Sequence, residues 1–300
     1  MTISEVIRQV GRGVKGASDL SREEARHVFR KILLKEVSQI ELGAFCIAMR
    51  MKGETANELA GFMDAVSEQM RPLRQVRQTR TIVLPSYNGS RKNRNLTPLL
   101  ALQLTKLGFF VIVQGIQSDP NRVTSFEIFQ RLEWPTLDDT LSEIVINQTL
   151  PLFLPLNHVC PALQEVLDIR QQLGLRNSGH VLAKLINPVA ENAWQIVNYT
   201  HPEYPKILEQ YFVIRPSQVV LMRGHEGEPT SSLTRLPEMT FLKDGHLICK
   251  TEEFRFIDSE AASGLDVSSH VEFMRRIIHG QEKMPDAVIN QADLINTHCL

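Results

Sequence analysis

Acidic residues are absent from a fifty-residue segment of this 300-residue chain. Gln69 to Ser118 contains neither aspartate nor glutamate, although roughly five or six would be expected at the chain's overall frequency. The basic residues of the segment are Arg71, Arg74, Arg77, Arg80, Arg91, Lys92, Arg94 and Lys106. Because no acid stands near them in the sequence, these cations are available to phosphate groups. The alternative is a solvated basic surface that binds nothing in particular.

The net charge of −1 hides a division of charge along the chain. Residues 1–118 carry 18 basic and 10 acidic side chains, a net charge of +8. Residues 119–300 carry 15 basic and 24 acidic side chains, a net charge of −9. The amino-terminal third is therefore the part suited to a polyanion.

Cysteine pairs and long apolar runs are also missing. Four single cysteines, without a Cys-x-x-Cys pair, exclude a zinc ribbon and a disulfide framework. No histidine pair has a metal-binding spacing and no serine stands in a nucleophile elbow, so we assign no metal site, cofactor or catalytic residue. The amino terminus lacks the apolar stretch of a signal peptide, and no window approaches eighteen uncharged apolar residues. We expect a cytoplasmic protein without a membrane partner.

The pattern of the chain predicts two domains and a linker. Residues 1–70 have helical spacing and include a capping box at Ser21 and Glu24, which predicts a small helical domain. Residues 71–80 repeat arginine every third position, which aligns the cations only in an extended connector. Residues 81–300 alternate strands and helices, typical of an α/β domain with a mainly parallel sheet. Part of 155–185 is a candidate for packing with the helical domain.

The loop that follows the expected strand 81–85 is the strongest local site. Loops beyond the carboxyl ends of parallel strands bind ligands, and a helix amino terminus there favours phosphate. We expect Thr97 to cap that helix, with Pro98 as its first residue. Asn88-Gly89 predicts a turn that takes positive φ. The loop holds no other glycine, so side-chain contacts to a polymer backbone suit it better than a main-chain cradle. A turn with exposed charges is the alternative.

Two segments carry a resemblance to a known family. Lys52–Thr55 reads KGET, and Leu167–Val189 reads LDIRQQLGLRNSGHVLAKLINPV. With the order helical bundle, connector and α/β domain, the chain resembles anthranilate phosphoribosyltransferase and its glycosyltransferase family 3 relatives over nearly its whole length. The residues that match the second motif are Arg170, Leu173, Gly174, Arg176, Leu182, Asn187 and Pro188. The resemblance implies the nucleoside phosphorylase/phosphoribosyltransferase fold.

The chain departs from the family at the donor site. The family's Gly-Thr-Gly-Gly-Asp loop for phosphoribosyl pyrophosphate is replaced by Pro85–Gly89, and its Lys-His-Gly-Asn motif by Val113–Ile116. The magnesium carboxylates align near Pro229 and Thr230, although a register shift would bring Glu226 or Glu228 there. Without those carboxylates a divalent cation is poorly held, and pyrophosphate leaves unassisted.

With these departures, the sequence resembles a non-enzymatic branch of the family. The resemblance implies homodimers that bind DNA or RNA, single- or double-stranded, with a link to DNA damage. We therefore expect a sequence-nonspecific nucleic-acid-binding protein without transferase activity. One alternative is a phosphoribosyltransferase or nucleoside phosphorylase with an altered donor loop. The other is a sensor of a small phosphorylated ligand, which would bind nucleotides without turnover. The expected binding residues are Arg74, Arg77, Arg80, Tyr87, Asn88, Arg91, Lys92, Arg94, Arg170 and Arg176.

Three further expectations concern single features. Tyr87, beside the basic loop, is expected to stack on an unpaired base. Arg170 either extends the basic groove or pairs with Asp168 or Glu165 on its own helix. The resemblance places the dimer contact on the helical domain, whose apolar side chains exceed what its short helices bury; they are Phe45, Ile47 and Met51.

Overall fold

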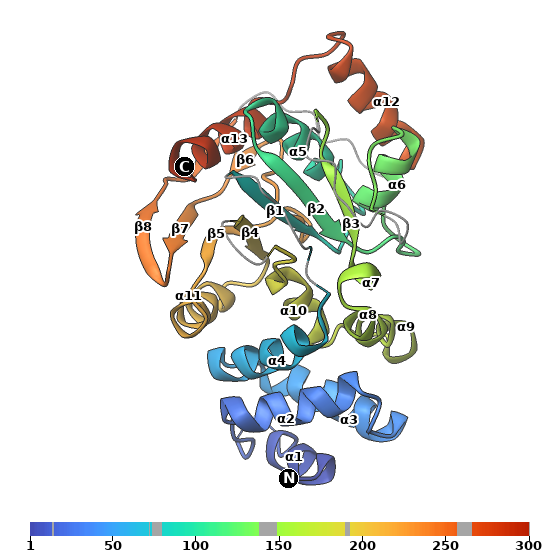
Figure 1. Ribbon diagram of the computed structural model, residues 1–300, viewed down its shortest axis with the longest axis vertical. Coiled ribbons are helices and arrows are strands. Elements are labelled where there is room, and N and C mark those ends of the chain that lie inside the picture. Colours follow the sequence, from blue (N-terminus) through green and yellow to red (C-terminus); the bar gives the residue numbers. More distant parts are fainter. Residues whose placement is uncertain are drawn as a thin grey trace.

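The computed structural model describes residues 1–13, 15–71, 73, 80–137, 149–189, 193–256 and 266–299. Most of the expected connector 71–80 lies outside these ranges, including Arg74 and Arg77. Of its described residues, Leu73 pairs with the main chain near Val189. The helical domain is at the bottom of Figure 1 and the sheet is above it.

The amino-terminal helices all begin in the same way. Each has a capping box in which a hydroxyl residue and a glutamate three positions later bond each other's main chain. The predicted box at Ser21 and Glu24 is one of them. The local sequence therefore determines where these helices start, and they are α1 (Ile3–Val10), α2 (Arg22–Leu33), α3 (Gln39–Lys52) and α4 (Ala56–Gln69).

The main sheet is mixed, with its parallel strands in the centre. Within the described residues it has the order β3-β2-β1-β4-β5-β7-β8, and only the pairs that involve β7 are antiparallel. This arrangement confirms the expected α/β class. The strands are β1 (Thr81–Ser86), β2 (Phe110–Gly115), β3 (Leu152–Pro155), β4 (Ala193–Tyr199), β5 (Gln218–Arg223), β7 (Met239–Lys243) and β8 (His246–Lys250), with β6 (Arg235–Leu236) and β9 (Phe254–Arg255) as a separate pair.

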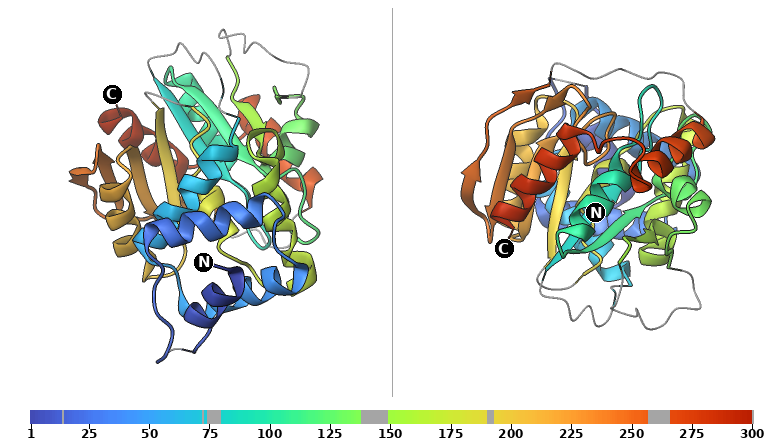
Figure 2. Two further views of the ribbon diagram at one scale, coloured as in Figure 1. Left: turned by 60° about the horizontal axis from the view of Figure 1, so that its bottom comes forward. Right: turned by 90° about the horizontal axis from the view of Figure 1, so that it is seen from above.

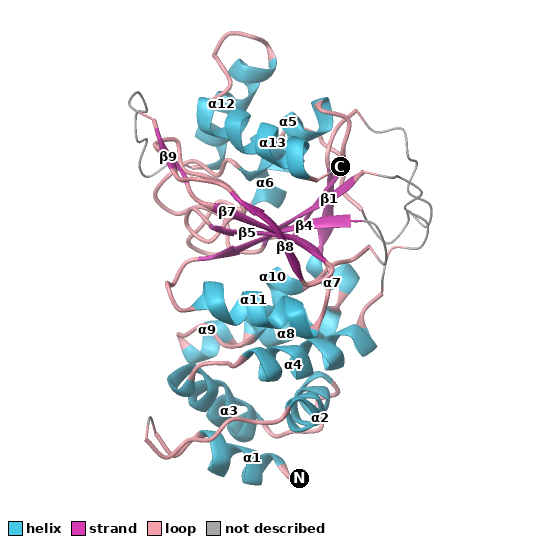
Figure 3. Cartoon of the chain, turned by 90° about the vertical axis from the view of Figure 1, so that its left-hand side faces the viewer, coloured by secondary structure: helices cyan, strands magenta, loops and turns pink. Residues whose placement is uncertain are grey.

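Helices cover both faces of the sheet, as Figure 3 shows. The face away from the helical domain carries α5 (Thr97–Lys106), α6 (Ser125–Arg131), α12 (Val267–Ile278) and α13 (Asp286–His298). The other face carries α7 (Leu156–Val159), α8 (Pro161–Asp168), α9 (Arg170–Leu173), α10 (Gly179–Leu185) and α11 (Tyr204–Ile214). Each face therefore has its own apolar cluster.

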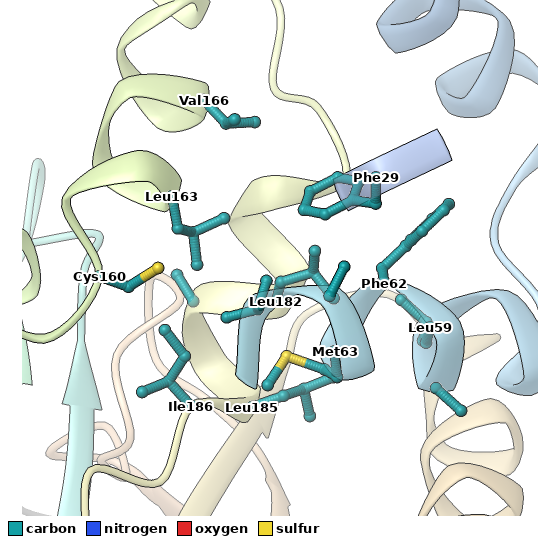
Figure 4. Packing of buried hydrophobic residues seen from close by; sticks show 14 of the residues in the cluster. Phe29, Leu59, Phe62, Met63, Cys160, Leu163, Val166, Leu182, Leu185 and Ile186 are labelled. Atoms are coloured by element: carbon teal, nitrogen blue, oxygen red, sulfur yellow. The ribbon is translucent and has the colours of Figure 1, made fainter. Parts of the chain in front are cut away.

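The helical domain and the lower face of the sheet share one apolar core. Phe29 and Phe62 of the amino-terminal helices pack with ring centres 4.9 Å apart and ring planes tilted by 34°. Leu163 of α8 and Leu182 of α10 belong to the same cluster, and Figure 4 shows these residues side by side. The right-hand view of Figure 2 shows the sheet from the face that lies away from the helical domain. Residues 156–185 thus form the layer that joins the two parts of the chain.

Two further sequence expectations concern cysteines and membranes. All four cysteines are free thiols, and Cys249 is the one that is only half-buried. In the part of the chain that the structure describes, no helix is both long and apolar enough to span a bilayer.

Truncation of Leu182 tests the shared core. Because this side chain is fully buried between the domains, Leu182→Ala should lower the free energy of unfolding by about 2–5 kcal/mol. Leu247→Ala is the matched control, since Leu247 is exposed on β8 and its loss should change stability by less than about 0.5 kcal/mol. Urea unfolding followed by circular dichroism measures both. Equal stability of the two variants would contradict a shared core.

Candidate nucleic-acid interface

The loop between β1 and α5 lies at the carboxyl end of the parallel strands. Its turn has Gly89 at φ +67°, and a Cβ there would lie 2.7 Å from the carbonyl oxygen of Val123. Ser90 and Val123 exchange main-chain hydrogen bonds of 2.9 and 2.8 Å. The expected Asn-Gly turn is confirmed, and the close approach of the two loops explains the need for glycine.

Glu228 occupies the inner half of this loop. Its buried carboxylate accepts hydrogen bonds from the amides of Asn88 (3.1 Å) and Gly89 (2.7 Å). The hydroxyls of Ser86 and Thr97 also donate to it. Burial raises the pKa of Glu228, and these four hydrogen bonds oppose that rise.

Glu226 occupies the outer half of the loop. It accepts hydrogen bonds from the amides of Arg91, Lys92 (3.0 Å) and Asn93 (2.9 Å), and from the Asn93 side chain (2.9 Å). Burial disfavours its charge, but the bonds from these amides outweigh burial and hold the pKa of Glu226 below its usual value. A phosphate in this loop would need the same donors. Two carboxylates of the chain itself thus take the place of an anionic ligand.

The expected helix cap at Thr97 is wrong. The helix begins at Thr97 and its cap is Leu96, whose side chain makes no cap hydrogen bond; the amide of Thr97 donates to the Asn95 side chain at 3.1 Å. The Thr97 hydroxyl donates instead to Glu228 at 2.9 Å. The buried carboxylate is the stronger acceptor, because an ionised partner strengthens the bond.

Arg91 and Lys92 are the free cations of the loop. Both side chains are exposed, and neither forms a hydrogen bond or ion pair with any residue that the structure describes. Their amides hold Glu226, so the backbone is fixed while the charged ends extend into solvent. This is the arrangement that side-chain contacts to a phosphate backbone require.

Several other predicted residues gather near this loop. Arg176 donates to the side chain of Asn88, and Asn88 is itself buried and bonded to the carbonyl of Glu226. Arg170 forms an ion pair with Asp119 at 3.1 Å. The expected pairing with Asp168 or Glu165 on its own helix is therefore wrong. The groove reading of Arg170 stays a prediction, since a third of its side chain is exposed.

Three predicted residues lie elsewhere or are covered. Arg80 is at the opposite end of β1, where it bonds Asn296 at 2.7 Å and lies 4.2 Å from the ring centre of Phe109. Arg94 packs over the Phe273 ring at 4.1 Å. Tyr87 is only 4% exposed, so it does not present a face for stacking at the surface. Arg74 and Arg77 lie outside the described residues.

Arg122, which is not among the residues predicted from the sequence, also lies at this loop. Its guanidinium donates to the carbonyl of Gly89 at 3.0 Å and lies 3.8 Å from the carboxylate of Glu226. Burial lowers the pKa of Arg122, and the charge of Arg176 lowers it further. Arg122 lies just beyond the acid-free segment, which ends before Asp119. A search for cations without nearby acids therefore does not include it.

Comparisons with known proteins identify the family. Residues 4–70 match the model of the glycosyl transferase family helical bundle domain. The chain is 35% identical to the uncharacterized protein YbiB of Escherichia coli (strain K12) over 292 residues, which cover 96% of this chain and 91% of that protein. The chain belongs to the anthranilate phosphoribosyltransferase-like branch of glycosyltransferase family 3.

More distant members of this family share the fold. The chain is 21% identical to anthranilate phosphoribosyltransferase of Dictyoglomus turgidum, over 94% of this chain and 84% of that protein. The crystal structure of the Thermus thermophilus enzyme superposes with a TM-score of 0.76 at 24% identity, covering 97% of this chain and 86% of that one. The Saccharomyces cerevisiae enzyme in complex with PRPP and Mg gives 0.70 at 17% identity, with 98% and 86% covered.

The loop after β5 contains the residues that align with the family's magnesium carboxylates. Pro229 and Thr230 follow Glu228 directly, and Glu226 and Glu228 are both bound to the loop after β1. Among the described residues no group of three or more His, Cys, Asp and Glu side chains is placed to hold a metal ion. The register shift considered from the sequence would therefore require these carboxylates to leave their amides.

Removal of Glu226 tests whether a carboxylate fills an anion site. In Glu226→Ala the amides of residues 91–93 lose their acceptor, so the variant should bind inorganic pyrophosphate measurably more tightly than the wild-type protein. Asp293→Ala, which removes an exposed carboxylate on α13, is the charge-matched control and should bind like wild type. Isothermal titration calorimetry measures all three proteins. If Glu226→Ala behaves like the control, the amides do not form an anion site.

Proposed function

We propose that this chain is a sequence-nonspecific nucleic-acid-binding protein built on a phosphoribosyltransferase scaffold, without transferase activity. The family resemblance extends the proposal to a cytoplasmic protein of the DNA damage response. One observation carries it. The donors of the phosphate loop are bound by Glu226 and Glu228, while Arg91 and Lys92 of the same loop remain exposed and unpaired among the described residues.

The charges around the loop suit a polymer better than a small donor. A pyrophosphate group needs main-chain amides at close range, and here those amides already have carboxylate partners. A nucleic-acid backbone needs a row of cations that reach outward, which Arg91 and Lys92 supply and Arg170 and Arg176 extend. Contacts of this kind position the polymer and do not read its bases.

Charge reversal at the loop tests the interface. The double variant Arg91→Glu/Lys92→Glu should lose most nucleic-acid affinity, because two phosphate contacts become repulsive. The control Lys106→Glu/Lys243→Glu changes the net charge equally, but its residues are exposed at the opposite end of the sheet, and it should bind nearly as wild type does. Fluorescence anisotropy with single- and double-stranded oligonucleotides measures both.

The salt dependence is part of the same experiment. If about six cations engage, log K for the wild-type protein should fall with log salt at a slope of about −4 to −5. A flat salt response, or equal affinity of the loop variant and its control, would contradict the interface.

Transferase activity is the alternative function, and we expect none. With phosphoribosyl pyrophosphate, anthranilate and magnesium, turnover should equal the background without protein, because the loop donors are taken and the donor motifs are replaced. A coupled fluorescence assay of anthranilate consumption measures it. Turnover above background would favour the enzyme.

We also propose a homodimer through the helical domain. Its support is an exposed apolar stripe on α3, where Ile40 is 85% and Met51 67% exposed and Ile47 lies between them. Phe45, expected in this contact, is buried within its own domain, so that part of the expectation is wrong. The stripe lies on the face of α3 that its own domain leaves uncovered.

Acidic substitution of the stripe tests the dimer. Ile40→Asp/Ile47→Asp should give the mass of one chain in light scattering, because a charge at a buried contact is costly. Val213→Asp, on an exposed apolar residue of α11, is the control and should remain dimeric. A monomeric wild-type protein would contradict the proposal.

A further inference from the structure

A cavity of about 490 Å³ lies between the helical domain and the carboxyl end of the sheet. Its walls come from the turn before α4, the loop after β1, helix α10, the end of β4, and α11. The volume is within the usual range for small-molecule sites, roughly 300–1,000 Å³. Arg176 lines it and also bonds Asn88, so the cavity adjoins the loop that carries Arg91 and Lys92.

Lys184 is a buried cation in this cavity. Its ammonium group donates to the carbonyl oxygen of Asn198 at 2.9 Å, and it forms no ion pair with a described carboxylate. The Lys184 nitrogen carries three N–H donors when charged and two when neutral, so in either form at least one donor has no acceptor among the described residues. Burial lowers the pKa of Lys184 to about 7, and the charge of Arg176 adds to this effect. A buried donor of this kind favours a ligand that brings an acceptor oxygen.

Aromatic rings stand beside this cation. The Tyr87 ring centre is 5.6 Å from the Lys184 nitrogen. The His180 ring packs edge-on against the Tyr87 ring, with ring centres 6.0 Å apart. Burial lowers the pKa of His180 to about 3, so its ring is neutral at physiological pH. The inner part of the cavity therefore offers flat, uncharged walls around one amine donor, that of Lys184.

The outer part of the cavity is more exposed and also basic. Arg50 is exposed and Arg176 half-buried, and Arg50 donates to the carbonyl of Arg176 at 3.1 Å. Two carboxylates line the cavity: Glu54 accepts from Ser178 at 2.6 Å and Tyr204 at 3.0 Å, and Glu203 is exposed and forms no ion pair with a described cation. The two arginines are thus available to an anion at the mouth.

We propose that this cavity binds one nucleotide, with its base inside against Tyr87 and His180 and its phosphate at Arg50 and Arg176. A carbonyl oxygen of the base accepts a hydrogen bond from Lys184, as guanine O6 does from lysine in nucleic-acid complexes. Such an oxygen is present in guanine, cytosine, thymine and uracil, and absent from adenine. The nucleotide is either free or an unstacked unit of a bound single strand, and the second case rests on the proposed function.

The preference for a base carbonyl is the measurable consequence. By isothermal titration calorimetry, guanosine monophosphate should bind the wild-type protein about tenfold or more tightly than adenosine monophosphate. Lys184→Met should remove this difference, and Lys184→Gln, which keeps a donor, should restore part of it. Lys243→Met, at an exposed lysine, is the control and should keep the full preference. Thermal unfolding of each variant verifies that it is folded.

Oligonucleotides distinguish the two sources of the nucleotide. The ratio of affinities for oligo(dT) and oligo(dA) is measured for wild type and for Lys184→Met. A ratio that falls in the variant assigns the cavity to a base of the strand, and an unchanged ratio assigns it to the free nucleotide. Both results support the cavity site if the guanosine preference is present.

The proposal is overturned if guanosine monophosphate does not bind, or if it binds wild type and folded Lys184→Gln and Lys184→Met equally. This outcome is separate from failure of the proposed function. A protein that binds guanosine monophosphate but no oligonucleotide would contradict nucleic-acid binding and leave the cavity site intact.

Discussion

The carboxylates of Glu226 and Glu228, bound to the loop after β1, determine what this site is able to do. They satisfy five main-chain amides at the carboxyl end of the sheet, a place where α/β proteins commonly hold phosphate. The internal anion fixes the loop and removes its main-chain donors from any ligand. What remains for a partner is the outward charge of Arg91 and Lys92.

The layer of α8 to α10 connects this site to the helical domain. Leu163 and Leu182 bury their side chains in the core of that domain, while Arg170 and Arg176 of the same segment reach toward the loops after β1 and β2. One packed element therefore holds the two domains together and supplies cations to the site. The cavity with Lys184 lies along the same layer, which is why the loop and the cavity adjoin.

The sequence predicted the architecture well because its signals are local. Capping boxes, strand patterns and the Asn-Gly turn depend on neighbouring residues, and the structure confirms them. The site was predicted only in part, because its partners are distant along the chain. Glu226 lies more than 130 residues from the amides that it binds, and Arg80 pairs with Asn296 across 216 residues. A gap in acidic residues along the sequence does not reveal such partners.

The most direct test of the central claim is a crystal structure of the protein with a single-stranded oligonucleotide. We expect phosphates beside the side chains of Arg91 and Lys92, with Glu226 and Glu228 still bound to the loop amides. Phosphate bound to the amides of residues 88–93, with both carboxylates displaced, would contradict it. That result would show a working phosphate site of the kind that a transferase needs.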